Sequence, residues 1–493
     1  MTFVGIDTLA KAPLAEGDVF IGGRWREAGD RRAFPVYDPA TGELVREVSA
    51  AGAADALAAI EAAQSAAAEW RATPARRRSE ILHTAFTLMR EHTDTLARLI
   101  VAENGKAYRD AAGEVGYAAE FFRWFAEEAV RIGSSFADAP GGGYRHVVRK
   151  HPVGVTAFVT PWNFPAAMAA RKIAPALAAG CPVLLKPAPE TPLTALAVAA
   201  LLAEAGLPDG LLNVLPTDRA PEVVSVWLGD ERVRKFSFTG STATGRLLLE
   251  QAAANVVNVT MELGGNAPFI VCADADVDAA VLGAMDAKMR GGGEVCIAAN
   301  RFYVHTSVAA EFTEKFGAAM AASQAGPGLE DGVTLGPMIN KAAVDKIRGL
   351  VDDAVTRGAK VAACGTVPDG PGHFQPATVL TDVPDDARIL HEEVFGPVAP
   401  LTTFTDEDEM LARANATVHG LASYVYSRDV ARALRIAERL EAGMVGLNRG
   451  LLSDPAAPFG GVKQSGLGRE GGREGIEAFL ETQYIALDWP TAN

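Results

Sequence analysis

From residue 153 onward, short apolar runs of β type alternate with alanine- and leucine-rich stretches of helical character. The first series of runs consists of VGVTAFV, PVLLK, LLNVLP, KFSFTG, VVNVTMEL and PFIVC. The second series follows residue 296 and consists of RFYVH, AKVAACG, APLTTF, ASYVYS and GMVGLN. Alternation of strands and helices is typical of βαβ units with parallel sheets. The pattern therefore predicts two α/β units in series.

The chain before residue 153 has a different pattern. Residues 51–130 read as helices, one of which is predicted to begin at Thr73 and Pro74, as its N-cap and first-turn proline. Residues 131–152 contain the glycine-rich run APGGGY, followed by HVVRK. This composition predicts an extended excursion from the body of the protein.

Length and charge limit the classes of function. A chain of 493 residues is too long for one ordinary core, so two or three domains are expected. The net charge of −15 repels phosphate backbones and anionic lipids, so we expect no nucleic-acid and no membrane partner. The first twenty residues lack the pattern of a signal peptide, and the prolines in the uncharged stretch 153–170 argue against a membrane span.

The four cysteines, Cys181, Cys272, Cys296 and Cys364, are widely spaced and form no CxxC pair. This spacing predicts neither a disulfide framework nor a metal site, and it favours a reducing, cytoplasmic compartment.

Cys296 lies in the segment MRGGGEVCIAANR. A lone cysteine is usually a small buried hydrophobe. Here the preceding glycines let another backbone or a cofactor approach closely, and small residues follow at Ala298 and Ala299. A thiol of pKa ~8.5 also needs a base to act as a nucleophile at neutral pH. The segment alone leaves both roles open.

Two other polar residues stand in unusual settings. Glu262 is flanked by glycines at the end of a β-type run, in MELGG, where a structural glutamate is rarely placed. Asn163 lies between two prolines and two aromatic residues in TPWNFP, and it is either a turn residue or a donor to an oxyanion.

Two glycine-rich stretches were compared as phosphate-binding turns. GLGREG at 466–471 matches G-x-G-x-x-G, but no strand precedes it and too little chain follows to complete a βαβ unit. FTGSTATG at 238–245 follows a β-type run and opens a helix, which suits either a pyrophosphate or a plain turn.

Seven motifs occur in one order along the chain: TPWNFP, LLKPAPETP, FTGSTATG, MELGGNAPFIV, GGGEVCIAANR, EEVFGP and PFGGVKQSGLGREGG. Together they closely resemble the aldehyde dehydrogenase superfamily, from about residue 21 to the last predicted strand. The resemblance implies an α/β fold with two parallel-sheet domains and a β-ribbon for oligomerisation. It divides the chain into a cofactor-binding domain (1–132 and 152–261), a ribbon (133–151), a catalytic domain (262–463) and a C-terminal return segment with an oligomerisation strand (464–493).

The resemblance also implies catalytic roles. Cys296 attacks the aldehyde carbon, and Asn163 and the Cys296 N–H hold the thiohemiacetal alkoxide. Hydride transfer then leaves a thioester, and Glu262 activates the water that hydrolyses it. Lys172 matches a lysine near that proton path.

The implied cofactor is NAD or NADP. Lys186 matches the lysine on the adenosine ribose, Glu393 matches the ligand of the nicotinamide ribose, and Phe395 lies beside it. The remaining implied cofactor residues are Trp162, Gly240, Ser241, Gly245 and Leu263. NAD-preferring relatives often carry glutamate where this chain has Pro189, so we expect NADP to be accepted.

Arg171, Arg290 and Ser453 match the carboxylate clamp of succinate-semialdehyde dehydrogenases, and the loop with Ser453 leads to Phe459. The implied substrate is a small aldehyde with a distal carboxylate, namely succinate semialdehyde, with glutarate semialdehyde as its closest competitor. Salt bridges at the surface or between domains are the alternative role of the two arginines.

Three positions near Cys296 differ from the residues found in relatives. Glu294 and Gly291 replace glutamine and asparagine of many relatives, and Glu294 is expected to point away from the thiol. Ala298 replaces a second cysteine found in some relatives, so a regulatory disulfide is not expected.

The ribbon predicts a homodimer or homotetramer. A non-redox cysteine acyl-transfer enzyme and a non-catalytic family member remain as alternatives from other classes.

Overall fold

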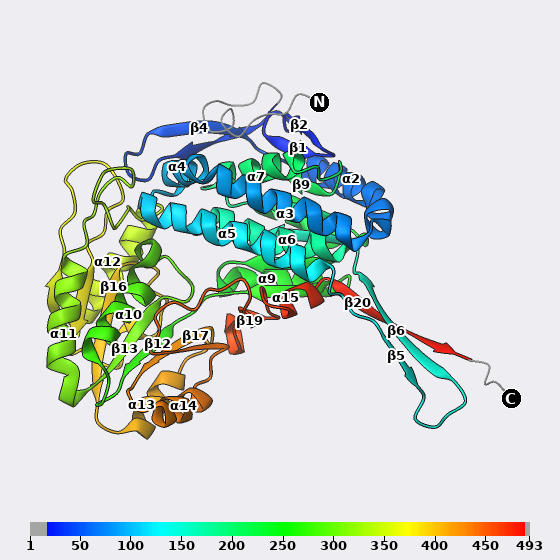
Figure 1. The fold of residues 1–493 in the computed structure, drawn as a ribbon. Helices are drawn as coiled ribbons and strands as arrows, with labels where there is room; N and C mark the ends of the chain where they lie inside the picture. The colour runs from blue at the N-terminus through cyan, green and yellow to red at the C-terminus, as the bar shows by residue number, and fades with distance from the viewer. Residues whose placement is uncertain (1–16, 489–493) are drawn as a thin grey trace.

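The computed structural model describes residues 17–488 of the 493-residue chain (Figure 1). The prediction that no signal peptide is present concerns mainly residues 1–16, which lie outside the described residues. Within the described range, no helix is both long enough and apolar enough to span a membrane. No cluster of three or more potential metal ligands occurs in that range either.

The first sheet has eight strands in the order β19-β11-β10-β7-β8-β9-β1-β2. The strands β11, β10, β7, β8 and β9 run parallel to one another. The strand β19 pairs antiparallel with β11, β1 pairs antiparallel with β9, and β2 pairs antiparallel with β1. The bounds of the strands are β1 Val19–Ile21, β2 Arg24–Arg26, β7 Val155–Val159, β8 Val183–Lys186, β9 Leu212–Val214, β10 Val233–Thr239, β11 Asn258–Glu262 and β19 Gly466–Leu467.

Helices cover both faces of this sheet, which explains why its strands are almost continuously apolar. Along β7, Val155 and Ala157 pack in one hydrophobic cluster, whereas Phe158 packs in another. The first face is covered by α2 (Ala53–Ala72), α8 (Ala220–Gly229) and α9 (Thr242–Ala253). The second face is covered by α3 (Ala75–Glu91), α4 (Thr93–Asn104), α5 (Tyr108–Ala129), α6 (Pro165–Ala179) and α7 (Pro192–Glu204).

The predicted start of one helix is wrong in detail. The helix α3 begins at Ala75, and no side chain caps its N-terminus. The Thr73 hydroxyl instead donates to the Glu69 carbonyl at 2.9 Å, in the last turn of α2. Thr73 therefore ends one helix and does not cap the next.

The second sheet has seven strands in the order β14-β15-β16-β13-β12-β17-β18, all parallel except β14. Their bounds are β12 Ala267–Val271, β13 Ala299–His305, β14 Lys360–Cys364, β15 Thr378–Thr381, β16 Val398–Phe404, β17 Ala422–Tyr426 and β18 Met444–Leu447. The helices around it are α10 Val277–Met289, η1 Arg290–Gly293, α11 Thr306–Ala321, α12 Lys341–Thr356, η2 Arg388–Leu390, α13 Glu407–Asn415 and α14 Val430–Arg439. The prediction of an α/β fold with two parallel sheets is thereby confirmed.

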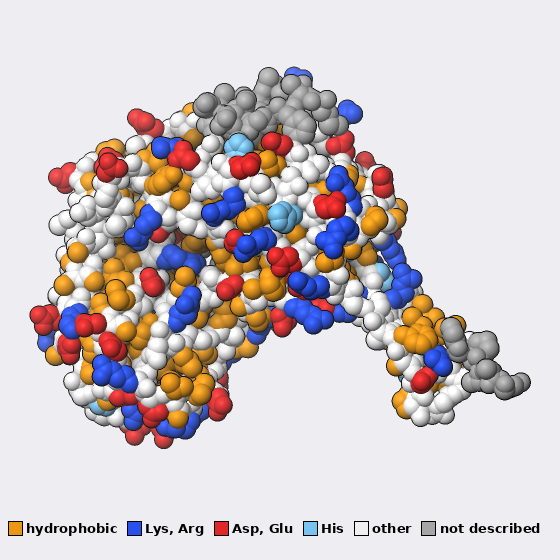
Figure 2. Space-filling view, in the orientation of Figure 1, with side chains coloured by type: hydrophobic (Ala, Val, Ile, Leu, Met, Phe, Trp, Pro, Cys, Tyr) orange, Lys and Arg blue, Asp and Glu red, His pale blue; other side chains and the backbone are white. Residues whose placement is uncertain are grey.

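Residues 131–152 form part of an arm that projects from the body (Figure 1). It consists of β5 (Ser135–Asp138), β6 (Arg145–Pro152) and β20 (Leu480–Leu487), paired antiparallel with β6 in the middle. Figure 2 shows hydrophobic side chains gathered on this arm. A separate hairpin joins β3 (Ala33–Tyr37) and β4 (Leu44–Ser49). The segment between β18 and β20 contains η3 (Lys463–Ser465), β19 and α15 (Glu474–Glu477).

The two sheets meet where their connecting loops carry the predicted site residues. In the first sheet, Asn163, Lys186 and Glu262 lie at or just after the carboxyl ends of the parallel strands β7, β8 and β11. In the second sheet, Cys296 and Glu393 precede the amino ends of β13 and β16. Carboxyl ends of parallel strands are the usual binding edge of such sheets.

Candidate active site

One cavity of about 290 Å³ lies between the two sheets. Nine of the residues singled out by the motifs line it: Trp162, Asn163, Gly240, Ser241, Glu262, Leu263, Cys296, Glu393 and Phe395. They come from loops that are up to about 230 residues apart in the sequence, so the fold gathers them at one point. Lys346 of α12 also lines the cavity, and no motif had indicated it.

Cys296 is half-buried and follows three glycines in left-handed backbone. At Gly293, a Cβ atom would lie 2.4 Å from the Gly396 carbonyl oxygen, so only glycine fits there. Burial raises the pKa of the Cys296 thiol to about 12; the Glu262 and Glu393 carboxylates add to the rise, and the Arg171 and Arg290 cations oppose it. The thiol is therefore protonated at neutral pH, and its attack needs a proton acceptor.

The Asn163 amide lies beside the nucleophile segment. Its Nδ2 donates to the Glu294 carbonyl oxygen at 2.9 Å, two residues before Cys296. That bond uses one of the two amide hydrogens, so the second remains available as a donor. The Asn163 Oδ1 is buried and has no hydrogen-bond partner among residues 17–488.

Glu262 ends β11, next to Thr239 on β10. Its side chain is buried, and neither carboxylate oxygen has a hydrogen-bond partner in the part of the chain that the structure describes. Burial raises the pKa of Glu262 well above its usual range; the negative charge of Glu470 adds to the rise, and Arg171 and Lys172 oppose it. A carboxylate of raised pKa is a stronger base toward water than an ordinary one.

Lys172 does not line the cavity. Its ammonium group donates to the Ser237 hydroxyl at 2.7 Å and pairs with the Glu470 carboxylate. Arg171 contacts the other oxygen of Glu470 at 3.7 Å. Glu470 was not predicted as a site residue, although GREGG flanks it with glycine much as MELGG flanks Glu262. The stretch 466–471 thus places a carboxylate beside Arg171 and Lys172, and its strand β19 pairs with β11.

The four residues assigned to substrate binding form two contacting pairs. Arg171 lies over the Phe459 ring, with 4.1 Å from the guanidinium carbon to the ring centre. Arg290 donates to the Ser453 hydroxyl at 3.2 Å. Both cations lower the pKa of the Cys296 thiol, so both lie within electrostatic reach of it.

Arg171 is buried and only partly satisfied. Its Nη2 donates to the Tyr117 hydroxyl at 2.6 Å, whereas its buried Nε has no partner within the described residues. Tyr117 was missed because nothing in its local sequence separates it from an ordinary helix residue. Arg171 therefore makes a buried ion pair with Glu470. This is not the surface salt bridge considered for Arg171, but it does join two segments of the predicted domain division.

The residues assigned to the cofactor extend from the cavity to Lys186. Lys186 is buried, and burial lowers its pKa to about 8, against the charge of Glu190. Its ammonium group makes no hydrogen bond or ion pair with any described residue, so it suits a ribose hydroxyl of a bound dinucleotide. Glu393 accepts the Gly265 N–H at 2.9 Å, and burial raises its pKa to about 7.

The remaining residues assigned to the cofactor lie in the turn of residues 238–245 or in the walls of the cavity. Ser241 caps α9 by accepting the Thr244 N–H at 3.2 Å. A Cβ atom at Gly245 would lie 2.5 Å from Leu263, so this glycine is needed for close helix–strand packing. Trp162 and Phe395 contact edge to face, with ring centres 5.5 Å apart.

The Glu294 side chain points to Ile339, whose N–H it accepts at 3.2 Å. Burial raises its pKa to about 8. Its neighbour Gly291 donates its N–H to Asp110 at 2.8 Å.

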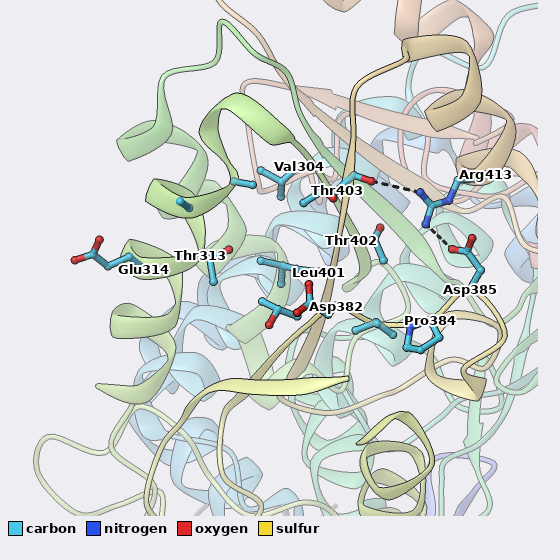
Figure 3. Close-up of a pocket in the computed structure, with 14 residues that line it drawn as sticks. Val304, Thr313, Glu314, Asp382, Pro384, Asp385, Leu401, Thr402, Thr403 and Arg413 are labelled. Atoms are coloured by element: carbon cyan, nitrogen blue, oxygen red, sulfur yellow. Dashed lines mark hydrogen bonds and ion pairs between the residues drawn. The ribbon is translucent and has the colours of Figure 1, made fainter. Parts of the chain in front are cut away.

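A larger cavity, of about 660 Å³, lies elsewhere in the second sheet, beside α11 and β16 (Figure 3). It contains none of the predicted site residues. Its cation Arg413 already pairs with Asp385 and donates to the Thr403 carbonyl (Figure 3). Size alone therefore does not select the candidate active site. The cavity at Cys296 is the better candidate, because buried oxygens of Asn163 and Glu262 there have no hydrogen-bond partner among residues 17–488.

The model of the aldehyde dehydrogenase family matches residues 25–485. The chain belongs to the aldehyde dehydrogenase family. It is 52% identical over 450 residues to a succinate-semialdehyde dehydrogenase of Paenarthrobacter nicotinovorans, covering 91% of this chain and all of that protein. It is 50% identical to a glutarate-semialdehyde dehydrogenase of Pseudomonas putida, covering 97% and 99% of the two chains. The crystal structure of a succinate-semialdehyde dehydrogenase from Burkholderia pseudomallei superposes with a TM-score of 0.94, at 49% identity and over 96% and 98% of the two chains.

These likenesses confirm the resemblance drawn from the seven motifs. The protein is an NAD(P)-dependent aldehyde dehydrogenase; relatives named for NADP(+) and solved with NAD+ each match more than nine-tenths of the chain.

Proposed function

We propose that this aldehyde dehydrogenase oxidises succinate semialdehyde to succinate with NAD or NADP. The observation that carries the proposal is the pair of cations, Arg171 and Arg290, within electrostatic reach of the Cys296 thiol. Two guanidinium groups can hold a distal carboxylate with charge-assisted hydrogen bonds of about 1.5–3 kcal/mol each. They also supply the positive field that a protein of net charge −15 otherwise lacks.

In the proposed reaction, the Cys296 sulfur attacks the aldehyde carbon, and the thiol proton passes to solvent water. The Asn163 amide and the Cys296 N–H donate to the alkoxide that forms, and one such donor is typically worth about 3–4 kcal/mol of barrier. A bound nicotinamide would supply the acceptor for the hydride of this carbon, and loss of the hydride would leave a thioester on Cys296. Glu262 then takes a proton from water as the water attacks the thioester, and the thiol is released with the carboxylic acid. The positive charge of Lys172 lowers the pKa of Glu262 and would therefore favour the return of Glu262 to its charged state.

We propose that Lys186 and Glu393 hold the two riboses. Gly240, Ser241 and Gly245 would form the pyrophosphate turn, and Trp162, Leu263 and Phe395 the walls. The unpaired ammonium group of Lys186 and the N-terminus of α9 support this assignment. Pro189 provides no carboxylate that would repel a 2′-phosphate, so NADP should be accepted.

Glutarate semialdehyde is the closest competing substrate, and the Pseudomonas putida relative is named for it. One methylene changes binding by only about 1–3 kcal/mol, so the clamp favours both substrates over an uncharged aldehyde. Ser453 and Phe459, which contact the two arginines, would set the distance from the clamp to Cys296.

The test compares kcat/KM for succinate semialdehyde, glutarate semialdehyde and butyraldehyde, each with NAD and NADP. We expect succinate semialdehyde to be preferred over butyraldehyde by a factor of about a hundred, equal to roughly 2.7 kcal/mol. Equal turnover of butyraldehyde would refute the clamp and leave the family assignment intact. No turnover with NADP would refute the inference from Pro189.

We further propose a homodimer or homotetramer assembled through the arm. Phe136, Tyr484 and Ile485 are exposed on it, and such side chains on a projecting sheet favour burial against a second copy. Light scattering at micromolar concentration should give a multiple of the monomer mass of 51.6 kDa, and a monomer would contradict this. A cytoplasmic location is proposed from the four free cysteines.

We also propose that the chain divides into a cofactor-binding domain (1–132 and 152–261), a ribbon (133–151), a catalytic domain (262–463) and a C-terminal return segment (464–493). The pairing of β19 with β11 supports it, because the C-terminal return segment thereby joins the sheet of the cofactor-binding domain.

A further inference from the structure

The loop that carries Asn163 (residues 160–165) is fixed by side chains from outside the reaction cavity. The Trp162 carbonyl accepts from Asn104 Nδ2 at 3.1 Å. The Asn163 carbonyl accepts from the Lys106 ammonium at 2.6 Å. Asn104 is the last residue of α4, Lys106 lies in the turn that follows α4, and both side chains are buried. The backbone that carries the Asn163 amide is therefore held by two hydrogen bonds, in addition to the bond between the Asn163 amide and the Glu294 carbonyl.

Lys106 is in turn held by Glu114 of α5. The Lys106 ammonium lies 2.7 Å from one carboxylate oxygen of Glu114. The other oxygen accepts the N–H groups of Ala166 at 2.8 Å and Ala167 at 3.3 Å, in the first turn of α6. One ion pair thus fixes the carbonyl of Asn163 and also the helix start that follows it.

Phe164, the residue after Asn163, is also contacted by the Lys106 ammonium. The Lys106 ammonium lies 4.0 Å from the centre of the Phe164 ring, and the Arg290 guanidinium lies 5.0 Å from it. Such contacts between a cation and a ring are favourable, the more so away from water. Through the Phe164 ring, the loop therefore contacts both Lys106 and Arg290, an arginine of the proposed clamp.

A buried ion pair such as Lys106–Glu114 is not explained by stability, because apolar residues of similar volume often stabilise the folded state equally well or better. Its use here is better explained by geometry. A donor to an alkoxide must be correctly placed before the reaction, and an error of about 1 Å can cost a factor of ~10² in rate.

We propose that Lys106, held by Glu114, is a positioning residue that fixes the Asn163 amide in the orientation that binds the alkoxide. The inference rests on the proposed function, because it assumes that Asn163 donates to the alkoxide.

The test is a double-mutant cycle of Lys106→Met and Asn163→Ala, measured as kcat with saturating aldehyde and NAD(P). Asn163→Ala should lower kcat by about 10²–10³-fold. Lys106→Met in the wild-type background should lower it by about 10–100-fold. In the Asn163→Ala background, Lys106→Met should cost about twofold or less, because the group that it positions is already gone.

Two comparisons separate positioning from general damage. Lys106→Met should lower kcat equally for succinate semialdehyde and butyraldehyde, because the alkoxide is common to both, and should leave the Kd for NAD(P) unchanged. Arg78→Met is the matched control, because Arg78 is a buried cation at the other end of α6, where it donates to the Ala178 carbonyl at 3.0 Å. Arg78→Met should lower Tm with little change in kcat, and Lys106→Arg should restore part of the lost kcat.

Each outcome decides a separate statement. If Asn163→Ala leaves kcat unchanged, the proposed function of Asn163 is wrong, and the inference about Lys106 falls with it. If Asn163→Ala is slow but the two changes multiply fully, Lys106 does not act through Asn163 and the inference alone is overturned. Should Lys106→Met fail to fold, Glu114→Gln takes its place in the same cycle with the same expected coupling.

Discussion

Two buried carboxylates lie near Arg171 and Lys172, one at the end of β11 and one in the loop after β19. Glu470 pairs with Lys172 and contacts Arg171, and these cations hold its pKa below the usual range despite burial. Glu262 feels the same two cations from farther away, has no hydrogen-bond partner among the described residues, and has a raised pKa. Direct pairing, more than burial, separates the two groups.

The difference assigns different chemistry to residues of one type. A paired carboxylate of low pKa is a fixed negative charge, suited to orienting the cations around it. An unpaired carboxylate of raised pKa is a stronger base, which can take a proton from water and return it later in the reaction. Two neighbouring glutamates can therefore divide the roles of anchor and base, and each of the following changes shifts one of the two.

The largest effect is expected from Glu262→Gln. We predict a fall in kcat of about 10²–10⁴-fold, because an amide cannot take the proton of the attacking water. Rapid mixing should show a burst of NAD(P)H of about one per active site, followed by slow turnover. The matched change Glu470→Gln should show no such burst, and a Glu262→Gln enzyme with wild-type kcat would contradict the role of base.

Arg171→Met and Arg290→Met should each raise KM for succinate semialdehyde by about tenfold or more, which corresponds to the loss of one charge-assisted hydrogen bond. KM for butyraldehyde should change little. Of these two arginines, Arg171 alone is among the charges that lower the pKa of Glu262, so Arg171→Met should also move the rising part of the pH profile of kcat to higher pH. Equal losses on both aldehydes would argue against a clamp.

Glu470→Gln should move that rising part in the opposite direction. The charge of Glu470 raises the pKa of Glu262, so its removal leaves the cations to lower that pKa. The active, charged form of Glu262 would then appear at lower pH, and we expect the rising part of kcat against pH to move to lower pH. A profile that stays in place would mean that the two carboxylates are independent.

The smallest effect is expected at Glu294, a third buried carboxylate, whose partner is a neutral backbone N–H. Its folded pKa of about 8 lies above the unfolded value of about 4.3. The stability that its protonated form contributes is therefore fully present below about pH 4.3 and is lost as pH rises through about 8. Glu294→Gln should raise Tm by a few degrees at pH 8.5 and by less at pH 5, and equal shifts at both values would contradict this.

Much of the fold could be predicted, because its central strands are apolar runs that both sheets bury on two faces. The strand β15 was not predicted, since TVLT is short and polar at both ends. The antiparallel pairing of β1, β2, β14 and β19 could not be predicted, because strand direction depends on the partner strand and leaves no local signal.

The candidate site could be predicted where a motif carries a proposed reacting group, as for Cys296, Glu262 and Asn163, which line one cavity. The supporting groups could not. Glu470 binds Lys172 across 298 positions of sequence, and Lys106 binds Asn163 across 57. Such contacts follow from the packed structure and leave no pattern along the chain.

The most direct test is mass spectrometry of Glu262→Gln after mixing with succinate semialdehyde and NAD(P). The account predicts a stable succinyl thioester on Cys296, because oxidation proceeds and hydrolysis is blocked. An enzyme that turns over without an adduct, or that carries its adduct on another residue, would contradict the assignment of nucleophile and base.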